Sequence, residues 1–282
     1  MLFTSIKTTT TLLILLLLAF QDVSGQSALF VAVEEDSRRR AERLLNRGAN
    51  PDGDGSPQHI PLIKAAELNR YHIAMMLLEH DVNVNIQNNI GFTPLMEAAF
   101  QRNNRILRRL ISHGADLEIQ ANNGATALMV AVNAGNNSTV RILLDAGANI
   151  ETRDNQGYTP IMNAMEEGAD IEMLRLLIEY DADLEAKDSD GNTAIMIHPY
   201  RNRVAAVRYL VNNGADVNTA NNEGITPLIK SVLEGNMEMA EFLVENGADI
   251  LAKDNHGSTA IDYAVTQFQI RQYLQSVLDE NN

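Results

Sequence analysis

Two pairs of neighbouring carboxylates, Glu34-Glu35 and Glu166-Glu167, are the first residues whose type and spacing could support acid–base or Ca²⁺ chemistry. Both pairs fall at the same phase of a repeated pattern, late in the first helix that each repeat should form. Neither pair has the alternating oxygen ligands of a calcium loop. The Asp-Ser-Asp-Gly run at 188–191 lacks the downstream Glu of such a loop, and turn chemistry explains it. We therefore predict no metal site.

The other reactive side chains also lack partners at a useful spacing. The six His fall at several phases of the pattern and form no His-Glu-x-x-His or other close ligand spacing. The absence of Cys excludes disulfides, thiolate zinc sites, iron–sulfur clusters and a Cys nucleophile. Neither a Gly-x-Ser-x-Gly run nor a phosphate-binding Gly-x-x-x-x-Gly-Lys run is present. The sequence thus predicts no catalytic residues and no cofactor, and hence a protein that is not an enzyme.

The charge balance restricts the partners. The chain has 22 Lys and Arg against 37 Asp and Glu, which gives a net charge of −15 at pH 7. Such a surface repels phosphate groups, and this argues against binding to nucleic acid or to an anionic membrane. We expect another protein as the partner, and one with a basic surface suits this charge.

The N-terminus predicts a targeting segment. The apolar run at 12–20 is too short to span a bilayer as a helix, which needs about 20 residues, and it fits the core of a secretory signal peptide. Val23-Ser24-Gly25 supplies small residues for a cut before Gln26. We predict a signal peptide over 1–25 and no stable membrane anchor after cleavage; an uncleaved anchor is the alternative. Export to a bacterial periplasm, or alternatively secretion, also suits a chain without Cys.

The rest of the chain, residues 26–282, consists of one repeated unit. Thr93, Thr126 and Thr159 open matching segments and lie 33 residues apart. The phase continues in both directions, with one step of 34, and gives eight copies. They start near 27, 60, 93, 126, 159, 193, 226 and 259. A period of this length indicates a solenoid in which each unit contacts only its neighbours.

Each copy carries the signals for two helices and a turn. The Thr is a helix N-cap, and Pro follows it at the first helical position in several copies, as at Pro94. Paired Leu, Ile or Val residues such as Leu143-Leu144 give the second helix an apolar stripe, and a Gly such as Gly147 ends it. The Asn-, Asp- and Gly-rich segment before the next Thr predicts a hairpin turn.

These units resemble the ankyrin repeat. The resemblance rests on segments such as TPLMEAA at 93–99 and VRILLDAGANI at 140–150, and it runs from Ser27 to about Gln275. It implies an all-α solenoid of helix-turn-helix units with β-hairpin-like loops. It also implies a concave face of hairpins and first helices that binds other proteins, and catalysis only rarely.

One column, meaning one set of equivalent positions in successive repeats, departs from the family pattern. The third position after the Thr, where the family usually has His, is apolar in six copies: Ile63, Met96, Met129, Met162, Met196 and Ile229. The column is either an adaptable apolar stripe on the concave side or a set of side chains that fill gaps between stacked first helices.

The sixth repeat departs as well. Pro199 falls inside the expected first helix, where it costs about 3 kcal/mol, and one extra residue stands just before it, near 168–172. These irregularities indicate either a specialised contact zone around Tyr200 and Arg201 or drift that the solenoid tolerates.

The Thr phase selects the candidate binding residues. Hairpin residues just before the Thr, and the seventh and eighth positions after it, should face the groove. The candidates are Leu68, Ile90, Phe92, Phe100, Tyr158, Glu166, Glu167, Tyr200, Arg201 and Leu233. An apolar and aromatic centre with an acidic rim is typical of a protein interface.

We therefore predict a monomeric, non-enzymatic protein-binding module that acts in an exported compartment. The alternative is an inhibitor or immunity protein that occupies a periplasmic or secreted enzyme or toxin. In that case the acidic groove would meet a basic active-site rim.

Overall fold

The computed structural model describes residues 27–166, 168, 170–197 and 203–280, and within them all regular structure is helical. The predictions for the signal peptide, for Pro199 and for Glu167, Tyr200 and Arg201 lie outside these residues. Contacts divide the chain into two compact units, of which unit 1 ends at Asn122 and unit 2 begins at Asn123. No described helix is both long and apolar enough to cross a membrane.

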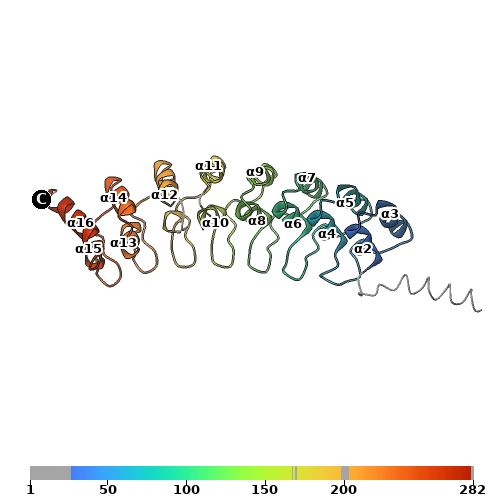
Figure 1. Ribbon diagram of the computed structural model, residues 1–282, viewed down its shortest axis with the longest axis horizontal. Helices are drawn as coiled ribbons and strands as arrows, with labels where there is room; N and C mark the ends of the chain where they lie inside the picture. Colours follow the sequence, from blue (N-terminus) through green and yellow to red (C-terminus); the bar gives the residue numbers. More distant parts are fainter. Residues whose placement is uncertain (1–26, 167, 169, 198–202, 281–282) are drawn as a thin grey trace, which may run out of the picture. The chain divides into compact units, whose positions relative to one another are not determined.

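Unit 1 consists of three helix pairs. The first helices are α2 (Ala28–Glu34), α4 (Pro61–Glu67) and α6 (Pro94–Phe100), and the second helices are α3 (Arg38–Asn46), α5 (Tyr71–Leu78) and α7 (Asn104–Ser112). Each first helix packs on its own second helix, and α2, α4 and α6 also pack on one another in order. Figure 1 shows the two resulting rows of helices in unit 1, with the turns extending beyond the row of first helices.

Unit 2 repeats the same arrangement. Its elements in chain order are α8 (Ala127–Asn133), α9 (Asn137–Asp145), α10 (Pro160–Glu166), α11 (Ile171–Glu179), the short 3₁₀ helix η1 (Ala194–Met196), α12 (Arg203–Asn212), α13 (Pro227–Leu233), α14 (Met237–Glu245), α15 (Ala260–Tyr263) and α16 (Phe268–Glu280). The predicted all-α repeat fold is confirmed. The loops contain no strand among the described residues, because they are tight turns closed by a few hydrogen bonds.

Threonine side chains begin many of the first helices. The hydroxyls of Thr93, Thr126 and Thr226 accept the backbone N–H three residues on, which satisfies a donor that the helix leaves unpaired. The hydroxyls of Thr159 and Thr193 are buried without a hydrogen-bond partner. The cap prediction therefore holds for the first three residues, but it fails at Thr159 and Thr193.

The core lies between the two rows of helices in each unit. At least one member of each apolar pair on the second helices is buried, as Leu77 and Leu143 show with no exposed surface. The column that departs from the family pattern is buried too, from 0% exposure at Met129 to 7% at Ile63. Burial decides between its two interpretations: these side chains fill space inside the stack, and they do not form an exposed stripe.

The sixth repeat has a shortened first helix. Its helical segment is η1, and Ile197 leaves the helical region with φ −77° and ψ 134°. The preceding repeat absorbs the extra residue before α11, where Asp170 accepts the backbone N–H of Glu172 at 3.2 Å and caps the helix. The irregular sequence therefore shortens one first helix and leaves the next second helix, α12, in place.

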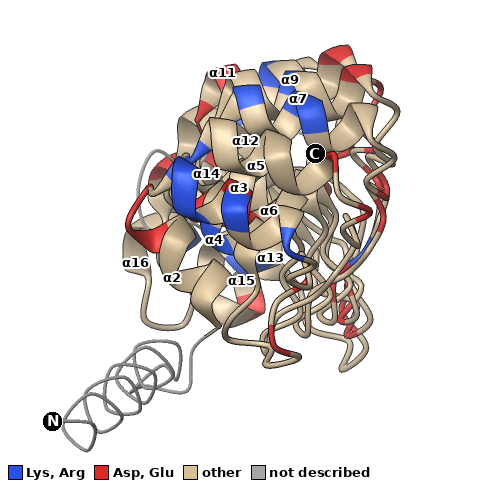
Figure 2. Ribbon diagram, turned by 90° about the vertical axis from the view of Figure 1, so that its right-hand side faces the viewer, with Lys and Arg blue, Asp and Glu red and all other residues tan. Residues whose placement is uncertain are grey.

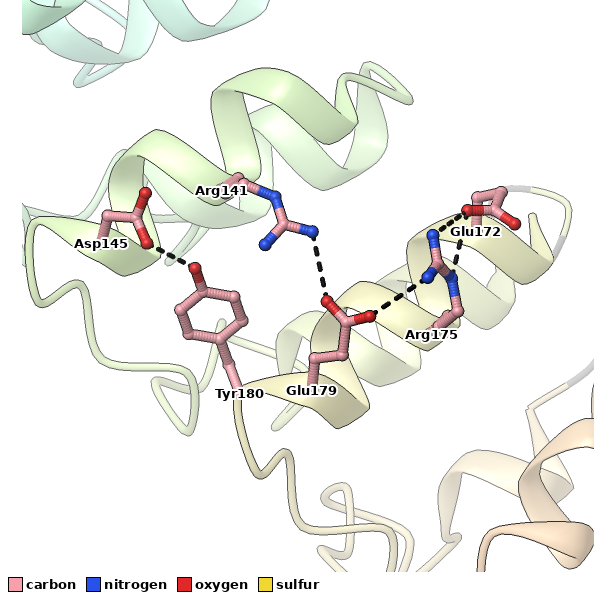
Figure 3. Close-up of polar contacts among 6 residues, drawn as sticks. All are labelled: Arg141, Asp145, Glu172, Arg175, Glu179 and Tyr180. Atoms are coloured by element: carbon pink, nitrogen blue, oxygen red, sulfur yellow. Dashed lines mark hydrogen bonds and ion pairs between the residues drawn. The ribbon is translucent and has the colours of Figure 1, made fainter.

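A network of ion pairs links the outer helices α9 and α11 (Figure 3). Arg141 of α9 lies 3.2 Å from Glu179 of α11. Arg175 contacts the same Glu179 at 3.2 Å and Glu172 at 2.5 Å. These side chains are half exposed, so each pair adds little to the free energy of folding. Both Arg141 and Arg175 are therefore paired with carboxylates.

Candidate protein-binding face

The turns of unit 1 are held together by backbone hydrogen bonds. The amide of Asn88 donates to the carbonyl of Phe92 at 3.0 Å and closes one turn. The next turn is tied to it, because the Asn122 amide donates to the Ile90 carbonyl at 3.1 Å and the Asn122 side chain donates to the Asn89 carbonyl at 3.0 Å. Successive turns therefore have a fixed register, and the side chains beside them are held in place.

The turns of unit 2 are linked by the same backbone hydrogen bond between successive turns, which we call the joint. The amide of Asn155 donates to the Asn123 carbonyl at 3.1 Å, and the amide of Asn222 donates to the Asp190 carbonyl at 3.0 Å. The joint requires glycine in the supporting turn. Gly124 has a φ of +85°, and a Cβ there would lie 2.4 Å from the Asn155 nitrogen. Backbone conformation and close approach therefore both exclude a side chain at this position.

Three of the predicted binding residues are exposed on unit 1. The exposed fraction is 37% for Leu68, 50% for Ile90 and 53% for Phe100. Leu68 is the C-cap directly after α4, Phe100 is the last residue of α6, and these two helices pack side by side. Phe92 is half-buried beside its own turn. Unit 1 thus presents neighbouring apolar side chains at the ends of its first helices.

A carboxylate that sequence reasoning missed lies on the same helices. Glu97 of α6 is half-buried, and the Gln101 side chain donates to it at 2.9 Å. Burial raises the pKa of Glu97, and the nearby charge of Glu67 raises it further. Lys64 lies 2.7 Å from Glu67. The signal that could have identified Glu97 is its phase, four residues after the Thr, where Lys64 stands in the preceding repeat.

A small cleft opens beside these charged residues. Its volume is about 210 Å³, and its lining includes Phe30, Ile60, Ile63, Lys64, Glu67, Asn88, Asn89 and Glu97. The first helices contribute the charges, and the turn contributes the amides. A partner side chain that enters the cleft meets both an ion pair and apolar walls.

On unit 2 the described candidates are Tyr158, Glu166 and Leu233. Tyr158 is half-buried, Glu166 is exposed and Leu233 is 48% exposed. Burial raises the pKa of the Tyr158 hydroxyl, and the charges of Glu166 and Asp188 raise it further. A cleft of about 390 Å³ lies beside Leu233, lined by Asp190, Asn192, Asn221, Asn222, Glu223, Ile225, Lys230 and Leu233.

The comparisons with known proteins agree with this geometry. The family model for ankyrin repeats in three copies matches residues 29–121, 95–188 and 170–254, which together are most of the chain. The chain belongs to the ankyrin repeat family. Many solved structures match the fold. One is the crystal structure of the human ASB11 ankyrin repeat domain, with 25% identity, a TM-score of 0.65, and coverage of 77% of this chain and 96% of that chain. No curated protein matches the sequence.

Membership in the family gives the coarse function. Ankyrin repeats are protein–protein interaction modules, and proteins built from them are typically not enzymes. Among the residues that the structure describes, no group of three His, Asp or Glu side chains could hold a metal ion.

The acidic charge of this ankyrin protein is concentrated in unit 2. Residues 27–122 have 11 Lys and Arg against 12 Asp and Glu, whereas residues 123–282 have 10 against 24. Some of these acids join repeats: the Glu151 carboxylate accepts the Asp183 amide at 2.8 Å, and the Glu185 carboxylate accepts the Asp216 amide at 2.8 Å. Others surround Tyr158. The total charge of the chain concealed this difference, although counting by halves would have shown it.

Proposed function

We propose that, in each of the two units of this ankyrin protein, the first helices and turns form a face that binds a protein partner. One observation supports the proposal most directly. Seven large apolar side chains are exposed in the described residues, and four of them, Leu68, Ile90, Phe100 and Leu233, occupy these positions. The other three are Leu251 and Val265, which lie in the turns before and after α15, and Phe268, which begins α16. Exposed apolar groups that gather on one kind of surface indicate a contact site.

On unit 1 the anchor of this face is Phe100. Its ring is half exposed, and Leu68 is the C-cap of the neighbouring first helix. The Lys64–Glu67 ion pair and the half-buried Glu97 lie on the same two helices. An aromatic side chain with aliphatic and charged neighbours is the usual composition of an energetically dominant contact.

On unit 2 the face selects a basic partner. Glu166 and Asp188 lie close enough to the Tyr158 hydroxyl to raise its pKa, so the field there is negative. Complementary charge on the partner would accelerate association and favour basic surfaces over acidic ones. We expect the protein to act as a monomer in this complex.

The proposed place of action is outside the cytoplasm. The apolar run at 12–20, followed by Val23-Ser24-Gly25, supports a signal peptide, and the absence of Cys suits an oxidising compartment. A bacterial periplasm is the first location that we propose, and secretion is the second. N-terminal sequencing of the protein recovered from the exported fraction should begin at Gln26. A protein that retains residues 12–20 would contradict the cleavage.

A second candidate function is that of an inhibitor or immunity protein for an exported enzyme or toxin. The carboxylates near Tyr158 favour it, because a nuclease or a similar toxin presents a basic active-site rim that they could cover. Under this proposal the partner loses activity in the complex, whereas a scaffold leaves its partner active.

The experiment is a pull-down from the exported fraction with the mature chain as bait, followed by affinity measurements on the captured partner. Replacing Phe100 with Ala should weaken binding about thirty-fold, since a central aromatic contact is commonly worth about 2 kcal/mol. Phe268→Ala is the matched control, because Phe268 is 76% exposed but lies in α16, outside the proposed face. Equal losses in the two variants would refute the face.

A further inference from the structure

The outer helices of unit 1 have an unusual set of charges. Helices α3, α5 and α7 together carry seven arginines, no lysine and a single acid, Glu42. All seven are on α3 and α7, and six of them are exposed. Figure 2 shows the blue Arg positions on these two helices. This surface is separate from the first helices and turns, and the protein-binding face does not use it.

Most of these arginines have no acidic partner. Within the described residues only Arg40 forms an ion pair, with Glu35 at 2.9 Å. The contrast with unit 2 is direct, because Arg108 and Arg141 occupy the same position of successive repeats, 33 residues apart. Arg141 is paired with Glu179, whereas Arg108 has no such pair. The arginines of unit 1 therefore remain available to carboxylates from outside.

The repeat places the arginines in two columns. One column is Arg39, His72 and Arg105, and the other is Arg43, Met76 and Arg109, each with steps of 33 residues. Since α3 packs on α5 and α5 on α7, each column crosses three adjacent helices. Both columns thus have arginines on α3 and α7. On α5, between them, one column has His72, a weaker base than arginine, and the other has the apolar Met76.

Tyr71 orients the arginines of α7. The guanidinium of Arg105 lies 4.1 Å from the centre of the Tyr71 ring, and the Nε of Arg109 donates to the Tyr71 hydroxyl at 3.4 Å. Arginines that are already ordered lose less entropy when they bind a carboxylate.

The spacing and the composition indicate what fits this surface. Packed helices lie about 8–10 Å apart, and seven residues of an α-helix rise about 10.5 Å and return to nearly the same face. Residues on one face of a strand instead recur at about 6.6 Å and 13 Å. A helix that crosses α3, α5 and α7 would therefore meet one helix per heptad. Arg, Tyr and Met are also enriched in protein interfaces, where Lys is depleted.

We propose that the outer face of α3, α5 and α7 binds an acidic amphipathic helix of a partner protein. Carboxylates about two heptads apart contact Arg39 and Arg43 at one end and Arg105 and Arg109 at the other. An apolar side chain midway contacts Met76. The net charge of −15 opposes a long polyanion such as nucleic acid, whereas a short acidic helix contributes its charge only at the arginines.

The test uses the mature chain and a designed helical peptide of about 20 residues, with two Glu pairs about two heptads apart and one Leu midway. Binding is measured by fluorescence anisotropy at low salt. We expect binding that weakens at least ten-fold in Arg105→Gln/Arg109→Gln. The matched control is Arg141→Gln/Arg175→Gln, which removes the same number of charges from paired arginines of unit 2 and should change the affinity less than two-fold. Circular dichroism verifies that both variants remain folded.

Three results would overturn the proposal. The first is no peptide binding, or equal binding of a scrambled peptide of the same composition. The second is an equal loss in the two double variants. The third is tighter binding, through the same arginines, of a single-stranded oligonucleotide of equal charge, which would assign the surface to nucleic acid.

Discussion

Replacing Gly124 with Ala should destabilise unit 2 much more than replacing Gly147 with Ala. Both glycines have positive φ, +85° and +92°, so both variants place an L side chain in an unfavourable backbone conformation. The surroundings differ. Nothing lies within 4 Å of a Cβ at Gly147, whereas a Cβ at Gly124 would lie 2.4 Å from the Asn155 nitrogen and 2.7 Å from its side-chain oxygen.

The magnitudes follow from this difference. The left-handed conformation costs about 1–2 kcal/mol for a residue with a Cβ, which is the whole effect expected for Gly147→Ala. In Gly124→Ala the new methyl group must also displace a neighbouring backbone, and overpacking of this kind costs about 1–3 kcal/mol. The displaced atom belongs to the amide that donates to the Asn123 carbonyl at 3.1 Å, so the joint between the turns weakens as well. We expect Gly124→Ala to lower the free energy of unfolding by about 2–5 kcal/mol in total.

Urea unfolding of the wild type and both variants measures these losses. The slope of the free energy against urea should stay the same, because a single methyl group changes neither end state, while the midpoint falls further in Gly124→Ala. Equal midpoints in the two variants would show that the turns do not touch as described. The turns beside the binding face would then have no fixed register.

Three further predictions concern the same repeats. Leu143→Asp should lower the free energy of unfolding by more than about 3 kcal/mol, because the Leu143 side chain has no exposed surface. Glu166→Ala, at an exposed position, should change it by no more than about 0.5 kcal/mol. Similar thermal melts for the two variants would refute the helix assignment. The raised pKa of Glu97 means that the folded state binds the proton of this carboxyl more tightly than the unfolded state does, so the free energy of unfolding falls as the pH rises above the ordinary pKa of 4.5. Glu97→Gln should therefore be more stable than the wild type at neutral pH. Urea melts below about pH 4 should show no such gain. Thr93→Val should lower the free energy of unfolding by about 1 kcal/mol through the lost cap hydrogen bond. Thr193→Val should be neutral or stabilising, because the Thr193 hydroxyl has no partner. Chemical denaturation distinguishes the two variants, and a larger loss at Thr193 would contradict the description of that helix start.

The elements of the fold could be predicted from the sequence because their signals are local. A Thr cap needs only the amide three residues on, and an apolar pair such as Leu143-Leu144 needs only one helix face. Thr159 and Thr193 are the failures, because both hydroxyls are buried without a partner. The local signal of Thr193 equals that of Thr126, but the shortened helix of the sixth repeat provides no cap hydrogen bond. Thr159 lacks the bond although its helix, α10, has its full length.

The candidate site was harder to predict because exposure depends on neighbouring repeats. Phase places Phe92 and Phe100 on the same kind of surface, yet Phe92 is half-buried and Phe100 is half exposed. Glu97 was missed for a related reason: its environment is created by Glu67, one repeat away, and by burial that no pattern within a single repeat reveals. The arginine columns were hidden by a net charge that sums both units.

The joint between the turns has a consequence for how such a protein can change its length. At its centre are backbone groups, an amide that donates to a carbonyl one repeat earlier, as between Asn222 and Asp190. A contact between backbone groups does not depend on which two copies meet, provided that glycine and the turn are kept. A gain or loss of one whole repeat would therefore rebuild the same joint, whereas an insertion of a few residues inside a turn would break it. Gene duplication and unequal recombination could thus lengthen or shorten the array in whole repeats, and so add or remove binding side chains in groups.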